Sequence, residues 1–293
     1  MAAAGSAGLT AEPAWSDMAG WLAGGNEATD ITRRLSDWLL QRPELIAQGT
    51  PMDSAAVGAP VPRPPATYCV AGNYARHIAE GSSGQKPPAK SETIPYFFSK
   101  PLTAVSGPYA RVTPSALARR LDHEVELGVV IGRRCQAVEA EQALQYVAGY
   151  LVFDDLSARS IASPPGRRPR PDDEFFDFLL GKWGDGCAPM GPYLVTPDEI
   201  PDPQRLTMEL RVNGELRQAG STAEMIFSIA ELIAWLSSAV TLETGAVIAT
   251  GTTSGVAYAT GRWLHGGDTV EATIDGLGCQ RTTIGHWKGD APE

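Results

Sequence analysis

The run Leu121–Gly132, LDHEVELGVVIG, carries two glutamates in a pattern suited to metal chemistry. Glu124 and Glu126 are two residues apart, so in a β-strand both would lie on one face, next to an apolar core. Two carboxylates close together away from water repel each other, so one takes a proton or both bind a cation. An all-oxygen site suits Mg²⁺ or Mn²⁺. An edge strand with two solvated glutamates is the alternative that this run leaves open.

A histidine and a glutamate with helical spacing form the second candidate. In Tyr74–Glu80, YARHIAE, His77 and Glu80 are three residues apart and would be neighbours on a helix, where the carboxylate can orient the imidazole. The loop-like run Gly81–Lys90 follows, and a short helix with such a loop can act as a lid over a site. A surface helix end with a chance pairing is the alternative.

Two further acids end a buried strand. Gly149–Phe153, GYLVF, is apolar, and Asp154 and Asp155 follow it directly. Acids at the end of a strand are where a site can form. Alternation alone does not decide which of the two points inward.

The elements around these residues predict a β-rich α+β protein. Asp30–Leu40 has a helical apolar stripe capped by Thr29 or Asp30, and Leu206–Gln218 reads as a hairpin with a type I′ turn at Asn213-Gly214. Ser228–Glu231 is a capping box that opens a helix to about Ala239. Further strands are expected over Tyr68–Gly72, Pro95–Lys100, Gly191–Val195, Gly245–Ala249 and Val270–Ile274.

A Pro-rich link divides the chain. Gly58–Pro65, GAPVPRPP, cannot be helical, so we expect an N-terminal helical and extended segment over 1–66 and a catalytic domain over 67–288. The Pro- and Arg-rich run 161–171 is expected to be an exposed loop.

Composition limits the function classes. The 293 residues carry a formal net charge of −10 at a pI near 5.0, which argues against nucleic acid as a standing partner. The four cysteines form no CxxC pair and the four histidines are scattered, so no zinc or disulfide pattern is expected. We expect no membrane span and no signal peptide, and hence a cytoplasmic protein.

Together these pieces resemble the fumarylacetoacetate hydrolase family, and the resemblance spans roughly Tyr68 to Ile284. It rests on eight segments in order: NYARHIAE, PYFFSKPLTA, DHEVELGVVIG, GYLVFDDLSAR, GKWGDGCAPMGPYLV, VNGELRQ, MIFS and TGTTSG. No single segment decides the matter, but eight at sensible spacing make chance very unlikely. The branch that it resembles includes acylpyruvate hydrolases, oxaloacetate decarboxylases and hydrolases of 2,4-diketo sugar acids.

The resemblance implies a mixed β-roll around the site, usually in a homodimer, and a Mg²⁺ or Mn²⁺ ion held by Glu124, Glu126 and Asp155. It implies a catalytic role for His77 and Glu80 as the lid dyad and for Lys182 as a buried lysine. The residues expected to contact a 2-oxo or 2,4-diketo acid substrate are Tyr74, Lys100, Thr250, Gly251 and Thr252.

The expected activity is hydrolysis of a C–C bond in an acylpyruvate-like acid. The metal would act as a Lewis acid towards the enolate that leaves, Lys182 would add positive charge beside it, and His77 would activate water. The alternative is a decarboxylase or an enol–keto isomerase of the same fold, because many members read SARD-x-Q where this chain has Ser160 and Ala162. A non-catalytic protein that has kept the fold is a third hypothesis. The segment 161–178 is also longer than usual.

Overall fold

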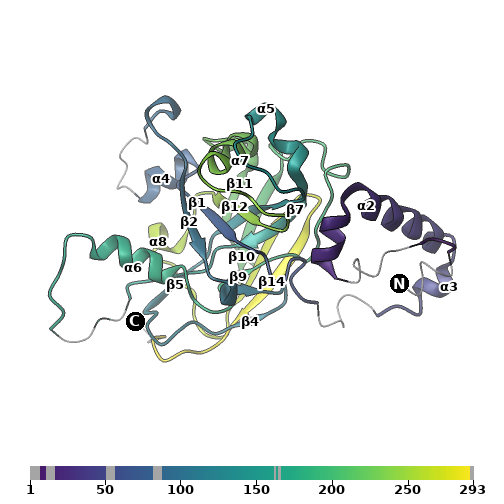
Figure 1. The fold of residues 1–293 in the computed structure, drawn as a ribbon. Coiled ribbons are helices and arrows are strands. Elements are labelled where there is room, and N and C mark those ends of the chain that lie inside the picture. Colours follow the sequence, from purple (N-terminus) through teal and green to yellow (C-terminus); the bar gives the residue numbers. More distant parts are fainter. Residues whose placement is uncertain are drawn as a thin grey trace.

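The computed structural model describes residues 7–10, 17–50, 57–81, 88–161, 163 and 166–290. Two five-stranded sheets form its centre (Figure 1). The first has the order β2-β1-β12-β6-β7, and only β1 and β12 run parallel in it. Its strands are β1 (Thr67–Ala71), β2 (Tyr96–Lys100), β6 (Val125–Ile131), β7 (Val147–Asp154) and β12 (Val247–Thr252).

The second sheet has the order β11-β10-β13-β14-β4 and is antiparallel except for the β14–β4 pair. Two short pairs, β3–β9 and β5–β8, complete the strands. These strands are β3 (Val105–Ser106), β4 (Arg111–Val112), β5 (Arg120–Asp122), β8 (Ser157–Arg159), β9 (Ala188–Pro189), β10 (Thr207–Val212), β11 (Glu215–Ser221), β13 (Thr269–Ile274) and β14 (Gly278–Ile284). The strand-rich mixed architecture confirms the predicted fold class.

Helices lie around the sheets, with α2 and α3 at one end of the molecule and α4 and α6 at the other (Figure 1). The α-helices are α2 (Met18–Leu40), α3 (Pro43–Ile46), α4 (Ala75–Gly81), α5 (Ala140–Ala143), α6 (Asp173–Gly181), α7 (Ile229–Ala239) and α8 (Ala257–Thr260), and the 3₁₀ turns are Lys90–Glu92, Leu102–Ala104, Leu144–Tyr146 and Thr222–Glu224. No helix in the described ranges is long and apolar enough to cross a bilayer.

Strand β6, between β12 and β7, is buried on both faces at every position. Gly128 in this strand leaves room for the side chain of Leu151 on β7, because a Cβ there would collide with it. Leu22 of α2 packs into the same apolar cluster as Val130 and Leu151. The N-terminal segment therefore covers part of the first sheet.

The structure confirms two local predictions. Asn213 and Gly214 have φ of 52° and 81° between β10 and β11, as a type I′ turn requires. Ser228 and Glu231 form the capping box at the start of α7.

Other local predictions were wrong. The helix predicted over Asp30–Leu40 is present, but its predicted start was wrong: it is part of α2, which begins at Met18 with Asp17 as its cap and continues past non-helical Gly25. The helix α6 was not predicted, although its acidic first turn favours a helix. Gly191–Val195 forms only an isolated bridge between Tyr150 and Val195.

Removing the α7 cap tests how much this helix depends on it. The Ser228 hydroxyl accepts a hydrogen bond from the Glu231 N–H, and Glu231 accepts one from the Ser228 N–H at 2.8 Å. We expect Ser228→Ala to lower the free energy of unfolding by about 1 kcal/mol, since it leaves an N-terminal N–H without its partner. Urea unfolding measures this, and Ser238→Ala, near the other end of α7, is the matched control. An equal loss in the control would contradict the role of the cap.

Candidate active site

Three acidic side chains meet where β6 and β7 lie side by side. Glu124, Glu126 and Asp155 each offer a carboxylate oxygen, and these oxygens lie within 4.8 Å of one another. All three residues are at most 5 % exposed. The structure thus brings together the three residues that the sequence predicted as metal ligands.

The path of the chain differs from the expected single strand. β5 ends at Asp122 and β6 begins at Val125, so Glu124 lies in the break between them. Its N–H donates to Asp154 Oδ1 at 2.8 Å, and its carbonyl accepts from the Asp155 N–H at 2.9 Å. Of the two adjacent aspartates, Asp154 therefore supports the backbone of Glu124, while Asp155 joins the cluster. Burial raises the pKa of Asp154 to about 7.

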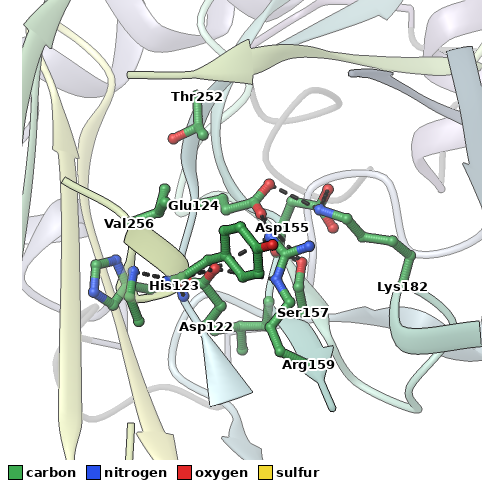
Figure 2. A network of polar contacts seen from close by, with 12 residues as sticks. Asp122, His123, Glu124, Asp155, Ser157, Arg159, Lys182, Thr252 and Val256 are labelled. Atoms are coloured by element: carbon green, nitrogen blue, oxygen red, sulfur yellow. Dashed lines mark hydrogen bonds and ion pairs between the residues drawn. The ribbon is translucent and has the colours of Figure 1, made fainter. Parts of the chain in front are cut away.

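Three basic side chains surround the cluster. Lys182 Nζ, just after α6, lies 2.8 Å from Glu124 Oε2 and 2.7 Å from Asp155 Oδ2 (Figure 2). Lys100 Nζ lies 2.5 Å from Asp155 Oδ1, and Arg159 binds Glu124. These contacts neutralise much of the negative charge on Glu124 and Asp155.

Glu126 differs from the other two acids, because its carboxylate accepts from a backbone N–H, that of Gly251, at 2.7 Å. Burial, Asp155 and Glu124 raise the pKa of Glu126 well above its usual value. Burial opposes ionisation of Glu124 too, but there the charges of Lys182 and Arg159 prevail and lower its pKa to about 2. The cluster is thus short of positive charge on the side of Glu126.

This donor set fits a hard divalent cation. Carboxylate oxygens are the preferred ligands of Mg²⁺ and Mn²⁺, and a cation next to Glu126 would stabilise its ionised form. Glu124, Glu126 and Asp155 are the residues that would hold it.

His77 of the dyad lines the same cavity as Glu124 and Glu126. His77 Nδ1, on α4, is 3.0 Å from Glu80 Oε1, and both oxygens of Glu80 accept from the Gly255 N–H, at 3.0 and 2.8 Å. Glu80 thereby orients the imidazole and also ties α4 to the turn after β12. With Nδ1 occupied, the Nε2 atom of His77 is the one left for proton transfer.

The cavity has a volume of about 220 Å³. Polar and charged side chains line one part of it, and apolar and aromatic ones line the rest. Its lining includes His77, Glu124, Glu126, Arg159, Lys182, Thr252, Val70, Ile78, Phe98, Phe178 and Tyr258. A volume below the 300–1,000 Å³ usual for drug-sized ligands suits a small substrate.

The predicted substrate contacts separate into two groups. Thr252 lines the cavity, whereas the Tyr74 hydroxyl lies against Met208 Sδ in the core, and Lys100 is 4 % exposed beneath Asp155. Thr250 Oγ1 donates to the carbonyl of Leu127. Tyr74, Lys100 and Thr250 therefore contact other groups of the protein and do not line the cavity. Gly251 contacts the cluster through its N–H, which donates to Glu126.

Sequence reasoning missed several residues of the site. Arg159, which was not among the predicted site residues, binds both Glu124 and Asp122. Phe178 comes from a helix that was not predicted, and Gln218 comes from the other sheet. The VNGELRQ segment contained Gln218, but its spacing gave no indication that the side chain is buried.

Three comparisons place the chain among known proteins. The sequence model of the protein family "Fumarylacetoacetate (FAA) hydrolase C-terminal" matches residues 66–285. An oxaloacetate tautomerase of Bacillus subtilis is 36% identical over 270 residues, covering 90% of this chain and 85% of that protein. A 2,4-didehydro-3-deoxy-L-rhamnonate hydrolase of a Sphingomonas species is 38% identical over 219 residues, covering 74% and 72%.

Solved structures agree with these sequence matches. The 5-carboxymethyl-2-hydroxymuconate delta-isomerase of Mycobacterium smegmatis superposes with a TM-score of 0.67 at 31% identity, covering 81% of this chain and 84% of that one. The match to the family model spans most of the chain. It includes the three acids of the cluster, both residues of the dyad and Lys182. The chain therefore belongs to the fumarylacetoacetate hydrolase family.

Proposed function

We propose that this protein is a metal-dependent enzyme that interconverts the keto and enol forms of a small 2-oxo acid. The observation that carries the proposal is one cavity lined by the buried Glu124–Glu126 pair and by His77, whose Nδ1 is held by Glu80. An enolate needs positive charge at its oxygen and a base near its carbon, and this cavity offers residues for both. The oxaloacetate tautomerases of Bacillus subtilis and Bos taurus support this choice of reaction.

The acidic cluster fits Mg²⁺ or Mn²⁺, which when bound would supply Lewis-acid polarisation of the 2-oxo group. His77 Nε2 takes a proton from the carbon next to that group and passes it to the 2-oxo oxygen to give the enol, and the reverse transfer gives the keto form, while Glu80 stabilises the imidazolium. The Lys182 ammonium adds positive charge at the edge of the cluster. Apolar side chains that include Phe98 and Phe178 exclude water, which strengthens these electrostatic interactions.

C–C bond hydrolysis of a 2,4-diketo acid is the second candidate. The same dyad can deprotonate a water molecule, and the rhamnonate hydrolase relative supports this reading. Against it stands the loss of the SARD-x-Q pattern, in which Ser160 and Ala162 replace the acid and the glutamine. Ser160 is exposed with φ of 54°, and Ala162 lies outside the described residues.

Two assays separate the candidates. The first follows the loss of enol absorbance of freshly dissolved oxaloacetate, and the second follows the loss of diketone absorbance of acetylpyruvate, each with added Mg²⁺ or with EDTA. We expect Mg²⁺-dependent acceleration in the first assay and no cleavage products in the second. Acetate and pyruvate in the second would favour the hydrolase, whereas no turnover in either would contradict both. Light scattering would test the homodimer, which we include in the proposal.

The aromatic wall predicts how substrate size is selected. Phe178 packs edge to face on Phe98 at 5.4 Å between ring centroids, and Lys182 Nζ lies 5.5 Å and 5.1 Å from the two rings. We expect Phe178→Ala to lower kcat/KM for the smallest 2-oxo acid about 5-fold, because one cation–π contact is lost and the wall recedes. Substrates with a larger distal group should lose less.

The control is Phe176→Ala on the same helix, where the side chain is 56% exposed. Steady-state kinetics on a series of 2-oxo acids with growing distal groups measures both variants. An equal drop for every substrate in both variants would contradict the assignment of Phe178 to substrate selection.

A further inference from the structure

We infer that Gln218 is a positioning residue that fixes the orientation of the two glutamates in the acidic cluster. It belongs to β11, the edge strand of the second sheet, whereas Glu124 lies just before β6 of the first sheet and Glu126 lies within it. Its side chain is 1 % exposed and does not line the cavity. The inference concerns the metal site within the proposed function.

Both ends of the Gln218 amide are used in the core. Oε1 accepts from the Val125 N–H at 3.1 Å, and Nε2 donates to Thr252 Oγ1 and to the carbonyl of Thr253, each at 2.8 Å. The orientation of the amide follows from chemistry, because a backbone N–H can only donate and a carbonyl can only accept. His123 Nδ1, 3.2 Å from Oε1, is therefore the donor in that contact.

These bonds close a ring around Val125, the residue between Glu124 and Glu126. Thr252 Oγ1 accepts from Gln218 and donates to the Val125 carbonyl at 2.8 Å. Both backbone groups of Val125 are thus held by side chains. Since the two glutamates flank this residue, rotation of its peptide groups would move their carboxylates relative to each other.

The ring lies where the ladder between β12 and β6 is irregular. Ala249 pairs with Gly128, but Thr252 pairs with Glu126, so β12 has one residue more than β6 between these pairs. The bulge includes Gly251, at φ of 94°, whose N–H donates to Glu126 Oε2. A bulge re-aims backbone groups at the cost of ladder bonds. The Gln218 and Thr252 side chains supply hydrogen bonds where the ladder is disrupted.

Two glycines allow β11 to come close enough for this contact. A Cβ on Gly220 would collide with Thr253 Oγ1, and a Cβ on Gly255 would collide with the Arg217 carbonyl. Replacing a residue that orients metal ligands without binding the metal itself typically weakens metal binding by 10–100-fold. Gln218 is such an orienting residue, although it comes from another sheet and touches neither carboxylate.

The test is Gln218→Met, which keeps the length of the side chain and removes its hydrogen bonds. We expect the Kd for Mn²⁺, measured by electron paramagnetic resonance on metal-stripped protein, to rise at least 10-fold. The matched control is Gln280→Met on β14 in the same sheet, where the glutamine is also 1 % exposed. Its Mn²⁺ affinity should stay within 2-fold of the wild type even if its Tm falls.

A purely structural role would lower the Tm of both variants and leave both affinities unchanged, and that result would overturn the inference. If Gln218→Met does not fold, Thr252→Val and Thr252→Ser replace it: the first removes the hydroxyl of the ring and should weaken Mn²⁺ binding, and the second keeps it and should not. Equal affinities in that pair would also overturn the inference. A wild-type protein that binds no Mn²⁺ would overturn the metal site itself, which is a distinguishable outcome.

Discussion

The variant Glu126→Gln is expected to lose metal-dependent activity while the metal-free protein becomes no less stable. The amide oxygen can still accept from the Gly251 N–H, so the fold keeps this hydrogen bond. Removing the charge relieves the repulsion by Asp155 and Glu124 that, together with burial, raises the pKa of Glu126. Replacement of a buried charge without a basic partner commonly stabilises a protein.

The measurements are calorimetric Mn²⁺ binding and thermal unfolding with and without the ion. We expect the Kd to rise more than about 100-fold, beyond the 10–100-fold that supporting residues give, because a direct ligand is altered. Because the variant binds the ion so weakly, adding the ion should no longer increase its Tm. Glu209→Gln, at a partly exposed glutamate on β10, is the control and should keep the Mn²⁺ affinity and the increase in Tm. An undiminished shift in Glu126→Gln would show that the cation binds elsewhere.

The acidic cluster could be predicted from the sequence because its members lie on short, strongly patterned segments. Glu124 and Glu126 precede a run of apolar residues, and Asp155 ends another, so two neighbouring strands suffice to bring them together. Alternation left Asp154 and Asp155 equivalent. The structure separates them by a tertiary contact, the bond from the Glu124 N–H to Asp154 Oδ1.

The residues that were missed depend on contacts between distant segments. Gln218 reaches the site because β11 packs on the turn after β12, and no local pattern encodes that approach. Tyr74 and Lys100 were assigned by resemblance alone, and their hydroxyl and ammonium groups point to Met208 and Asp155. The motifs alone do not give side-chain directions, because these depend on the tertiary contacts of the segments.

The dyad gives the second large prediction. His77→Ala should lower kcat for keto–enol interconversion by 10²–10⁴-fold, the range typical for the loss of a general acid–base group. The Mn²⁺ affinity should stay within about 2-fold of the wild type, because His77 is not one of the three clustered ligands. A large loss of metal binding would instead assign His77 to the metal. His265→Ala is the control, since that histidine has the same kind of partner, Asp290 at 2.9 Å, but is 52% exposed.

The same variant also separates reactions that share the site. Decarboxylation of oxaloacetate needs electron withdrawal at the 2-oxo group and no base, so any metal-dependent release of CO₂ should persist in His77→Ala. Hydrolysis and tautomerisation both need proton transfer and should fail together. Glu80→Gln should cost less than His77→Ala, because the amide oxygen can still accept from the Gly255 N–H and keep α4 in place. Retention of full tautomerase activity by His77→Ala would remove the dyad from the mechanism.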